Sequence, residues 1–178
     1  MRFSLPPADE WQPVSRPVFI AWLVFYALFA LHIATDGDGF PITHPVNLVI
    51  HEAGHPIFHA FGYTMGILGG TLAEILVPLL IAAYFFRQRH TTGVTFALFW
   101  MFTTSSGIAT YMADARTVAL PLIGSGDHDW EILFGQWGVL HLDTKIAAVV
   151  RALGWLGMAG TAGWFVWIRQ RIAAVREA

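Results

Sequence analysis

Long apolar runs are the feature of this sequence that most restricts its fold. The first of them, 18–34, reads VFIAWLVFYALFALHIA and contains no Asp, Glu, Lys or Arg. A membrane-crossing helix needs about 20 apolar residues, and lipid cannot satisfy free backbone groups, so such runs fold as helices. Further mostly apolar runs follow at 46–62, 67–86, 94–112 and 146–168. The pattern predicts an all-α fold, a polytopic transmembrane bundle of about four to five membrane helices.

The overall composition agrees with lipid as the surrounding solvent. Hydrophobic residues make up 56% of the chain and charged residues 12%, whereas a soluble domain carries about 25% charged residues. The net charge of −2 provides no basic field for nucleic acid. Cysteine is absent, so any metal must be held by His, Asp or Glu. We expect membrane lipid as a partner and no nucleic acid, and the sequence indicates no oligomeric state.

The 178 residues read as one integral membrane domain with three polar additions. These are an N-terminal tail (1–16), an extramembrane or interfacial segment (113–144) and a basic C-terminal tail (169–178). Arginines gather in the 87–89 loop and the C-terminal tail, and arginine-rich short loops face the cytoplasm. With the N-terminus on the same side, 46–62 enters and returns as a short or re-entrant helix; a five-span alternative puts the N-terminus outside. We expect a multi-pass protein of the bacterial inner (cytoplasmic) membrane.

The second apolar run contains the motif HExxH, with His51 and His55 four residues apart and Glu52 directly after the first histidine. On a helix, residues four apart are separated by about 40° around the axis, so both imidazoles can face one ion. Glu52 lies about 100° away and can act on a water held by that ion. Zinc lowers the pKa of such a water to about 7. The motif predicts a Zn²⁺ site with His51 and His55 as ligands and Glu52 as the catalytic base.

The polar stripe extends beyond the motif. Asn47, His51, His55 and His59 follow one another at four-residue steps among mostly apolar neighbours. Ionisable groups inside a membrane are costly and mark functional sites. The alternative interpretation is a set of core histidines that donate to backbone carbonyls, and His59 fits a residue beside the ligands better than a ligand.

Two residues compete as the third metal ligand. If 46–62 and 67–86 form a helical hairpin that turns near residues 63–65, Glu74 returns to about the depth of His55; otherwise Glu74 pairs with Arg151 or stays protonated. His128 follows a glycine-containing loop at 124–126 and stands between Asp127 and Asp129. We favour His128, because imidazole is the commoner zinc ligand.

The acids near His128 have expected roles of their own. Asp129 can orient a metal-bound imidazole without binding the metal itself, or one of the two flanking acids can cap a helix that begins here. Asp114 stands at the end of the fourth run beside Arg116. There it can form a local ion pair or help to line the site.

The motif segment, 46–80, resembles the site-2-protease class of intramembrane zinc metallopeptidases. The resemblance rests on His51–His55 in an apolar segment followed by Gly66, Gly69 and Gly70. It implies a polytopic helical fold, zinc, and hydrolysis of a membrane protein or peptide. In that class an Asp ligand comes from an Asn-Pro-Asp-Gly-like or Leu-Asp-Gly motif on a later span, and this sequence has no such motif.

Three functions are consistent with these patterns. The first is a zinc-dependent membrane metallohydrolase, a peptidase in particular. The second is an iron-dependent, histidine-rich membrane oxidoreductase, although His32, His90 and His141 are scattered along the chain. The third is a non-enzymatic metal-binding membrane protein. Glu52 favours the hydrolase, since a binding protein has no need of a carboxylate beside the two ligands.

Overall fold

The computed structural model describes residues 7, 10–35, 37, 39–122 and 127–177. Over these residues the chain forms helices and no strand, which confirms the all-α prediction. The loop predicted at 124–126 and the linker residues Asp36 and Asp38 lie outside the described residues. The helices are α1 (Arg16–Thr35), α2 (His44–His59), α3 (Tyr63–Arg87), α4 (Thr91–Ala113), α5 (Asp129–Gln136), the 3-10 turn η2 (Leu140–Leu142) and α6 (Asp143–Glu177).

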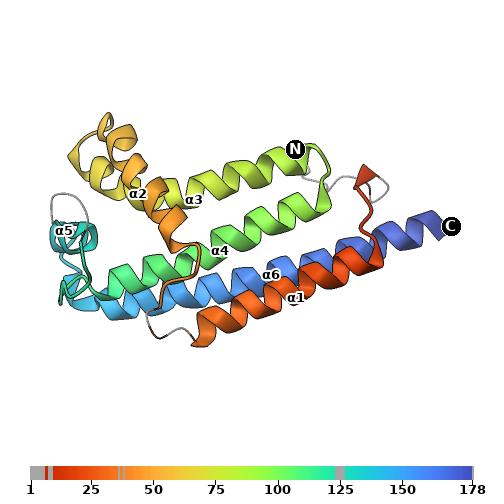
Figure 1. Ribbon diagram of the computed structural model, residues 1–178. Helices are drawn as coiled ribbons and strands as arrows, with labels where there is room; N and C mark the ends of the chain where they lie inside the picture. The colour runs from red at the N-terminus through yellow and green to blue at the C-terminus, as the bar shows by residue number, and fades with distance from the viewer. Residues whose placement is uncertain (1–6, 8–9, 36, 38, 123–126, 178) are drawn as a thin grey trace.

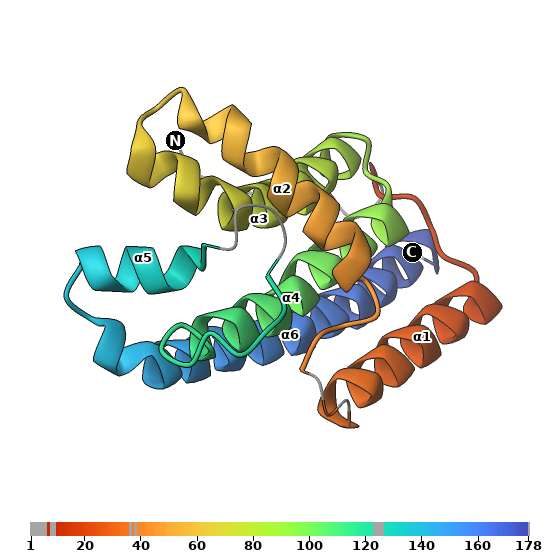
Figure 2. The same ribbon diagram turned by 60° about the vertical axis from the view of Figure 1, so that its left-hand side comes forward.

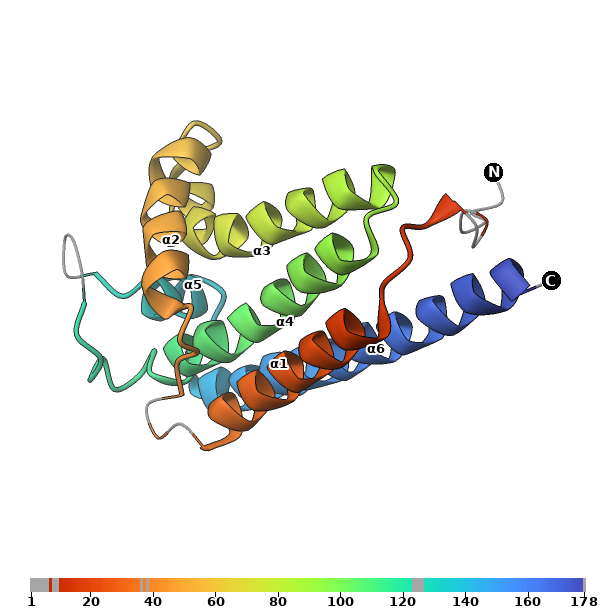
Figure 3. The ribbon, with the colours of Figure 1, turned by 45° about the vertical axis from the view of Figure 1, so that its right-hand side comes forward.

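Four long helices lie lengthwise beside one another, and the two short ones sit at one end (Figures 1 and 3). α4 packs against α3 on one side and α6 on the other, and α1 also contacts α4. α2 lies across α3 and α4, with α5 near the start of α3 (Figure 2). The start of α1 and the end of α6 lie at the opposite end of the bundle (Figure 1). The motif helix α2 is therefore far from both of them along the bundle.

Three stretches are long and apolar enough to cross a membrane: α1, α3 and the continuous η2–α6 segment. This is compatible with an integral membrane protein. α4 has 23 residues and sufficient length, but it is not among the three. Its Thr103, Thr104 and Ser106 are buried against neighbouring elements. A helix shielded in this way can carry small polar residues at its contacts.

The predicted segment boundaries need two corrections. The turn of the hairpin was expected near residues 63–65, but α3 already begins at Tyr63, and the turn comprises the residues just before it. The basic segment 169–178 was expected to be a tail after the last span. Instead α6 continues as helix to Glu177, because Ile168 and Ile172 pack with Trp11 in a buried cluster and hold this end in place.

Candidate metal centre

Close packing of α2 on α3 positions the motif. Gly54, inside the motif, lies so near Gly69 that a β-carbon at Gly54 would be 2.2 Å from the Gly69 carbonyl oxygen. A β-carbon at Gly69 would in turn be 2.6 Å from the β-carbon of Phe58. The glycines after the motif are therefore contact residues of the α2–α3 hairpin. On the other side, α2 is tied to α4 by Asn47, which donates to Thr104 (3.1 Å) and accepts from the Trp100 indole (2.9 Å).

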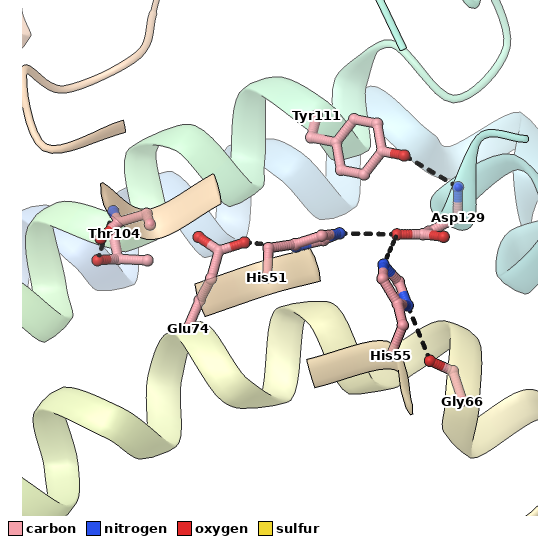
Figure 4. A network of polar contacts seen from close by, with 8 residues as sticks. His51, His55, Gly66, Glu74, Thr104, Tyr111 and Asp129 are labelled. Atoms are coloured by element: carbon pink, nitrogen blue, oxygen red, sulfur yellow. Dashed lines mark hydrogen bonds and ion pairs between the residues drawn. The ribbon is translucent and has the colours of Figure 1, made fainter. Parts of the chain in front are cut away.

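His51 is buried between two carboxylates. Its Nδ1 lies 2.6 Å from Glu74 Oε1, and its Nε2 lies 2.9 Å from Asp129 Oδ2 (Figure 4). Gly70 provides the space for the ring, since a β-carbon there would be 2.5 Å from Nε2 of His51. The hairpin therefore brings Glu74 to the motif, as its expected depth indicated, and α5 brings Asp129.

His55 faces the same carboxylate. Its Nδ1 donates to the Gly66 carbonyl at 2.9 Å, and its Nε2 lies 3.4 Å from Asp129 Oδ2 (Figure 4). An Nδ1 that donates leaves Nε2 without a hydrogen in the neutral ring. In His51 the carboxylate of Glu74 accepts from Nδ1, so Nε2 of this ring also carries no hydrogen when the ring is neutral. Two imidazole nitrogens and a carboxylate oxygen then face one point, and this arrangement requires a positive charge, either a proton on an imidazole or a cation between the three groups.

Glu52 lies beside the point that these three atoms face, on its solvent-exposed side. Its side chain is exposed, and ligand atoms of His51, Glu52 and His55 all lie within 4.8 Å of one another. These three residues form a group that could hold a metal ion. Their donor atoms are nitrogen and oxygen, which suit a divalent cation of the first transition row.

A cavity of about 820 Å³ opens onto the group. His51, Glu52, His55, Glu74 and Asp129 lie on its polar side, and His44, His59 and Asp127 also reach it. The remaining wall is mainly apolar, formed by Phe40, Leu48, Ile67, Ile108, Leu120, Pro121, Leu122 and Ile132. Such a volume suits a small molecule or a short peptide segment.

His128, the favoured third ligand, is not brought to the motif. Its Nδ1 accepts from the Glu131 amide (3.2 Å) and so caps α5, a role expected of a flanking acid. Burial lowers the pKa of His128 more than the nearby carboxylates raise it, which agrees with an unprotonated Nδ1. Its Nε2 points toward Asp114, 3.6 Å away. Asp129 occupies the position beside the motif in its place.

Asp114 and Arg116 organise the segment after α4. Asp114 accepts hydrogen bonds from the amides of Ala119 and Leu120 (3.0 Å each) and from the Thr117 hydroxyl. Burial raises the pKa of Asp114, but these hydrogen bonds outweigh it and hold the pKa below its usual range. Arg116 pairs with Asp143 at 2.7 Å instead of with Asp114. Among the described contacts, Asp114 therefore faces His128 and not a residue of the motif.

Tyr111, near the end of α4, is a site residue that the sequence did not single out. Its oxygen accepts a hydrogen bond from the Asp129 amide at 3.0 Å (Figure 4). Its ring lies against that of His128 in a tilted arrangement, with centroids 4.1 Å apart. The only sequence signal was its position three residues before Asp114, which did not distinguish it from other interfacial aromatics.

The fold and the site together define a helical bundle with three segments long and apolar enough to cross a membrane and a candidate His/Glu metal-binding group at one end. Comparison with protein-family models, curated proteins and solved structures finds no match to this chain.

Proposed function

We propose that the protein is a membrane-embedded, zinc-dependent hydrolase, in particular a peptidase. The observation that supports this most is the convergence of His51 Nε2, His55 Nε2 and the Asp129 carboxylate, with Glu52 beside them at a cavity. In this proposal Asp129 replaces His128 as the third ligand. His₂-carboxylate sets with an open position are typical of catalytic zinc sites.

Glu74 acts through His51 in this assignment. It lies 2.6 Å from Nδ1, on the side of the ring away from Asp129 (Figure 4). A carboxylate that accepts from the second nitrogen of a ligating imidazole fixes the ring and makes it more basic. The Gly66 carbonyl gives His55 the equivalent support.

The chemistry follows from the positions of these groups. A zinc ion held here would make water a nucleophile near neutral pH and polarise a carbonyl. Glu52 has no hydrogen-bond partner that would hold it away from the cavity among the described residues, so it is available to take the proton of that water. Glu52 then passes the proton to the leaving nitrogen.

The arrangement in the membrane supports the choice of substrate. Since α3 and α4 are joined by a short turn and lie side by side, we infer that α4 crosses together with α1, α3 and α6, four spans in all. The arginines near the start of α1, at the α3–α4 turn and near the end of α6 support a cytoplasmic location for that end, in a bacterial inner membrane. The site then faces the opposite half, where a membrane protein or peptide with an apolar segment can reach the apolar wall. The resemblance to site-2 proteases, confined to 46–80, also supports a membrane protein or peptide as the substrate.

The distribution of histidines weighs against an iron oxidoreductase. His90 caps α4 beside the α3–α4 turn, at the end of the bundle away from the site. His32 lies near the end of α1, and His141 lies in η2. A di-metal oxidoreductase needs its histidines gathered in one place, and among the described residues only the motif region brings several together.

Hydrolysis is tested by comparing the wild type with Glu52→Gln in lipid vesicles loaded with zinc. The vesicles also contain a mixture of single-span membrane peptides, and new amino termini are identified by mass spectrometry. We expect new termini with the wild type and with Glu131→Gln, a control carboxylate exposed on α5, but none with Glu52→Gln. Equal peptide profiles for wild type and Glu52→Gln would reject hydrolysis and favour the metal-binding alternative.

A further inference from the structure

The hydroxyl of Tyr111 has an unusual position in the candidate centre. Its oxygen receives the amide hydrogen of Asp129, the residue whose carboxylate faces both motif histidines. The phenol's own hydrogen has no acceptor among the residues that the structure describes. Tyr111 also lines the cavity, and its ring meets His51 edge-on with centroids 6.0 Å apart. A free O–H donor thus lies in the cavity wall next to the convergence point.

The tyrosine is held rigidly in this position. His128, which is fully buried, lies against the tyrosine ring at a centroid distance of 4.1 Å and an interplanar angle of 33°. His128 is itself fixed as the cap of α5 through the Glu131 amide. The ring therefore contacts two imidazoles, and its oxygen is fixed by the backbone of a candidate ligand. A donor positioned before the reaction stabilises developing charge without reorganisation.

We propose that Tyr111 is a catalytic hydrogen-bond donor, which stabilises the oxyanion that forms when the substrate carbonyl is attacked. This inference rests on the proposed hydrolase function. Water forms a bond to the carbonyl carbon, its proton goes to Glu52, and the carbonyl π pair moves to the oxygen. Tyr111 donates a hydrogen bond to that oxygen and keeps its proton. When the intermediate collapses, the carbon–nitrogen bond breaks and the leaving nitrogen takes the proton from Glu52.

The test uses Tyr111→Phe, which removes the hydroxyl and keeps the ring that contacts both imidazoles. Tyr63→Phe is the matched control, because Tyr63 also lines the cavity but is 61% exposed. The full chain is loaded with Co²⁺ in detergent, and methylphosphonate, a tetrahedral oxyanion, is titrated while the visible Co²⁺ spectrum is recorded. A hydrogen bond to a charged group is worth about 1.5–3 kcal/mol, so Tyr111→Phe is expected to raise the Kd by about 10- to 100-fold.

In the hydrolysis assay, loss of one oxyanion donor lowers kcat by about 10²–10³-fold, and KM should change little. An unchanged Kd for methylphosphonate in Co²⁺-saturated Tyr111→Phe overturns the proposal while the metal centre stands. No binding of methylphosphonate to the Co²⁺-loaded wild type also overturns it. Failure of the wild type to take up Co²⁺ rejects the proposed metal centre itself, and the donor role with it.

A second measurement covers the case in which Tyr111→Phe does not fold. The three tyrosines that remain in the Tyr63→Phe background, of the four in the chain, are replaced by 3-fluorotyrosine. The fluorinated phenol is more acidic and donates a stronger hydrogen bond, so methylphosphonate should bind more tightly than to the unlabelled protein. Equal affinity would contradict a donor role for Tyr111.

Discussion

Replacement of Glu74 by Gln separates an orienting carboxylate from a metal ligand. Glu74 lies 2.6 Å from Nδ1 of His51, and both side chains are nearly buried, at 12% and 7% exposure. Glutamine keeps the shape and an acceptor oxygen but removes the charge. Loss of such an outer partner costs 10- to 100-fold in metal affinity, or about 1.4–2.8 kcal/mol. Since the acceptor is retained, we expect a loss near tenfold.

The affinity is measured by competition for Zn²⁺ with a chelator of known affinity, using the full chain in detergent. Glu131→Gln, which changes an exposed carboxylate on α5, should leave the affinity unchanged. Asp129→Asn should weaken binding more than Glu74→Gln does, because it alters a ligand. Two results would refute the reasoning: an unchanged affinity in Glu74→Gln, or a loss of binding as complete as in His51→Ala, which would make Glu74 a ligand.

Three further predictions concern the surroundings of the centre. Gly70→Ala should lower zinc affinity by displacing His51, whereas Gly160→Ala, which has no atom within 4 Å of the new β-carbon, should not; the same chelator competition measures both. Asp114 has a pKa below its usual value, so its stabilising effect is present above about pH 4 and is lost as the pH falls through the folded-state pKa. The thermal midpoints of wild type and Asp114→Asn should therefore differ at about pH 5, and the difference should shrink as the pH falls below about 4. Chelation of the metal should speed hydrogen exchange of the backbone amides in the first turn of α5, while the amides where α4 packs on α6 stay protected. Mass spectrometry measures both.

The part of the site that could be predicted from the sequence is the part set by local helix geometry. The four-residue step between His51 and His55 fixes their common direction whatever packs around them. The position of Glu74 followed from one further assumption, a tight hairpin, and the glycines at 54, 69 and 70 make that hairpin close enough.

The choice between His128 and Asp129 could not be made in this way. Neighbouring residues on a helix point about 100° apart, so the start of α5 decides which of the two faces the motif. A difference of one residue in the cap exchanges their roles. The same holds for Tyr111, whose importance depends on α5 docking against α4 through Trp130, Leu133 and Phe134. Such contacts between distant segments leave no periodic signal in the sequence.

Hydropathy alone is also a limited guide to the number of membrane spans. The apolar run 94–112 was expected to be a membrane helix, and α4 covers it, yet α4 is not among the three helices apolar enough to cross. Five of its hydroxyl side chains are buried: Thr91, Thr95, Thr103, Thr104 and Ser106. If α4 crosses the membrane as we propose, its neighbours shield these groups from lipid, and composition alone does not reveal such a helix.

The central claim, a metal centre at the HExxH motif, is tested most directly by the metal content of the purified chain. The wild type, His51→Ala and Glu52→Ala are purified in detergent and analysed for bound metals by mass spectrometry. We predict about one zinc ion per chain in the wild type and in Glu52→Ala, and none in His51→Ala. A wild-type protein without stoichiometric metal after exposure to zinc would contradict the account.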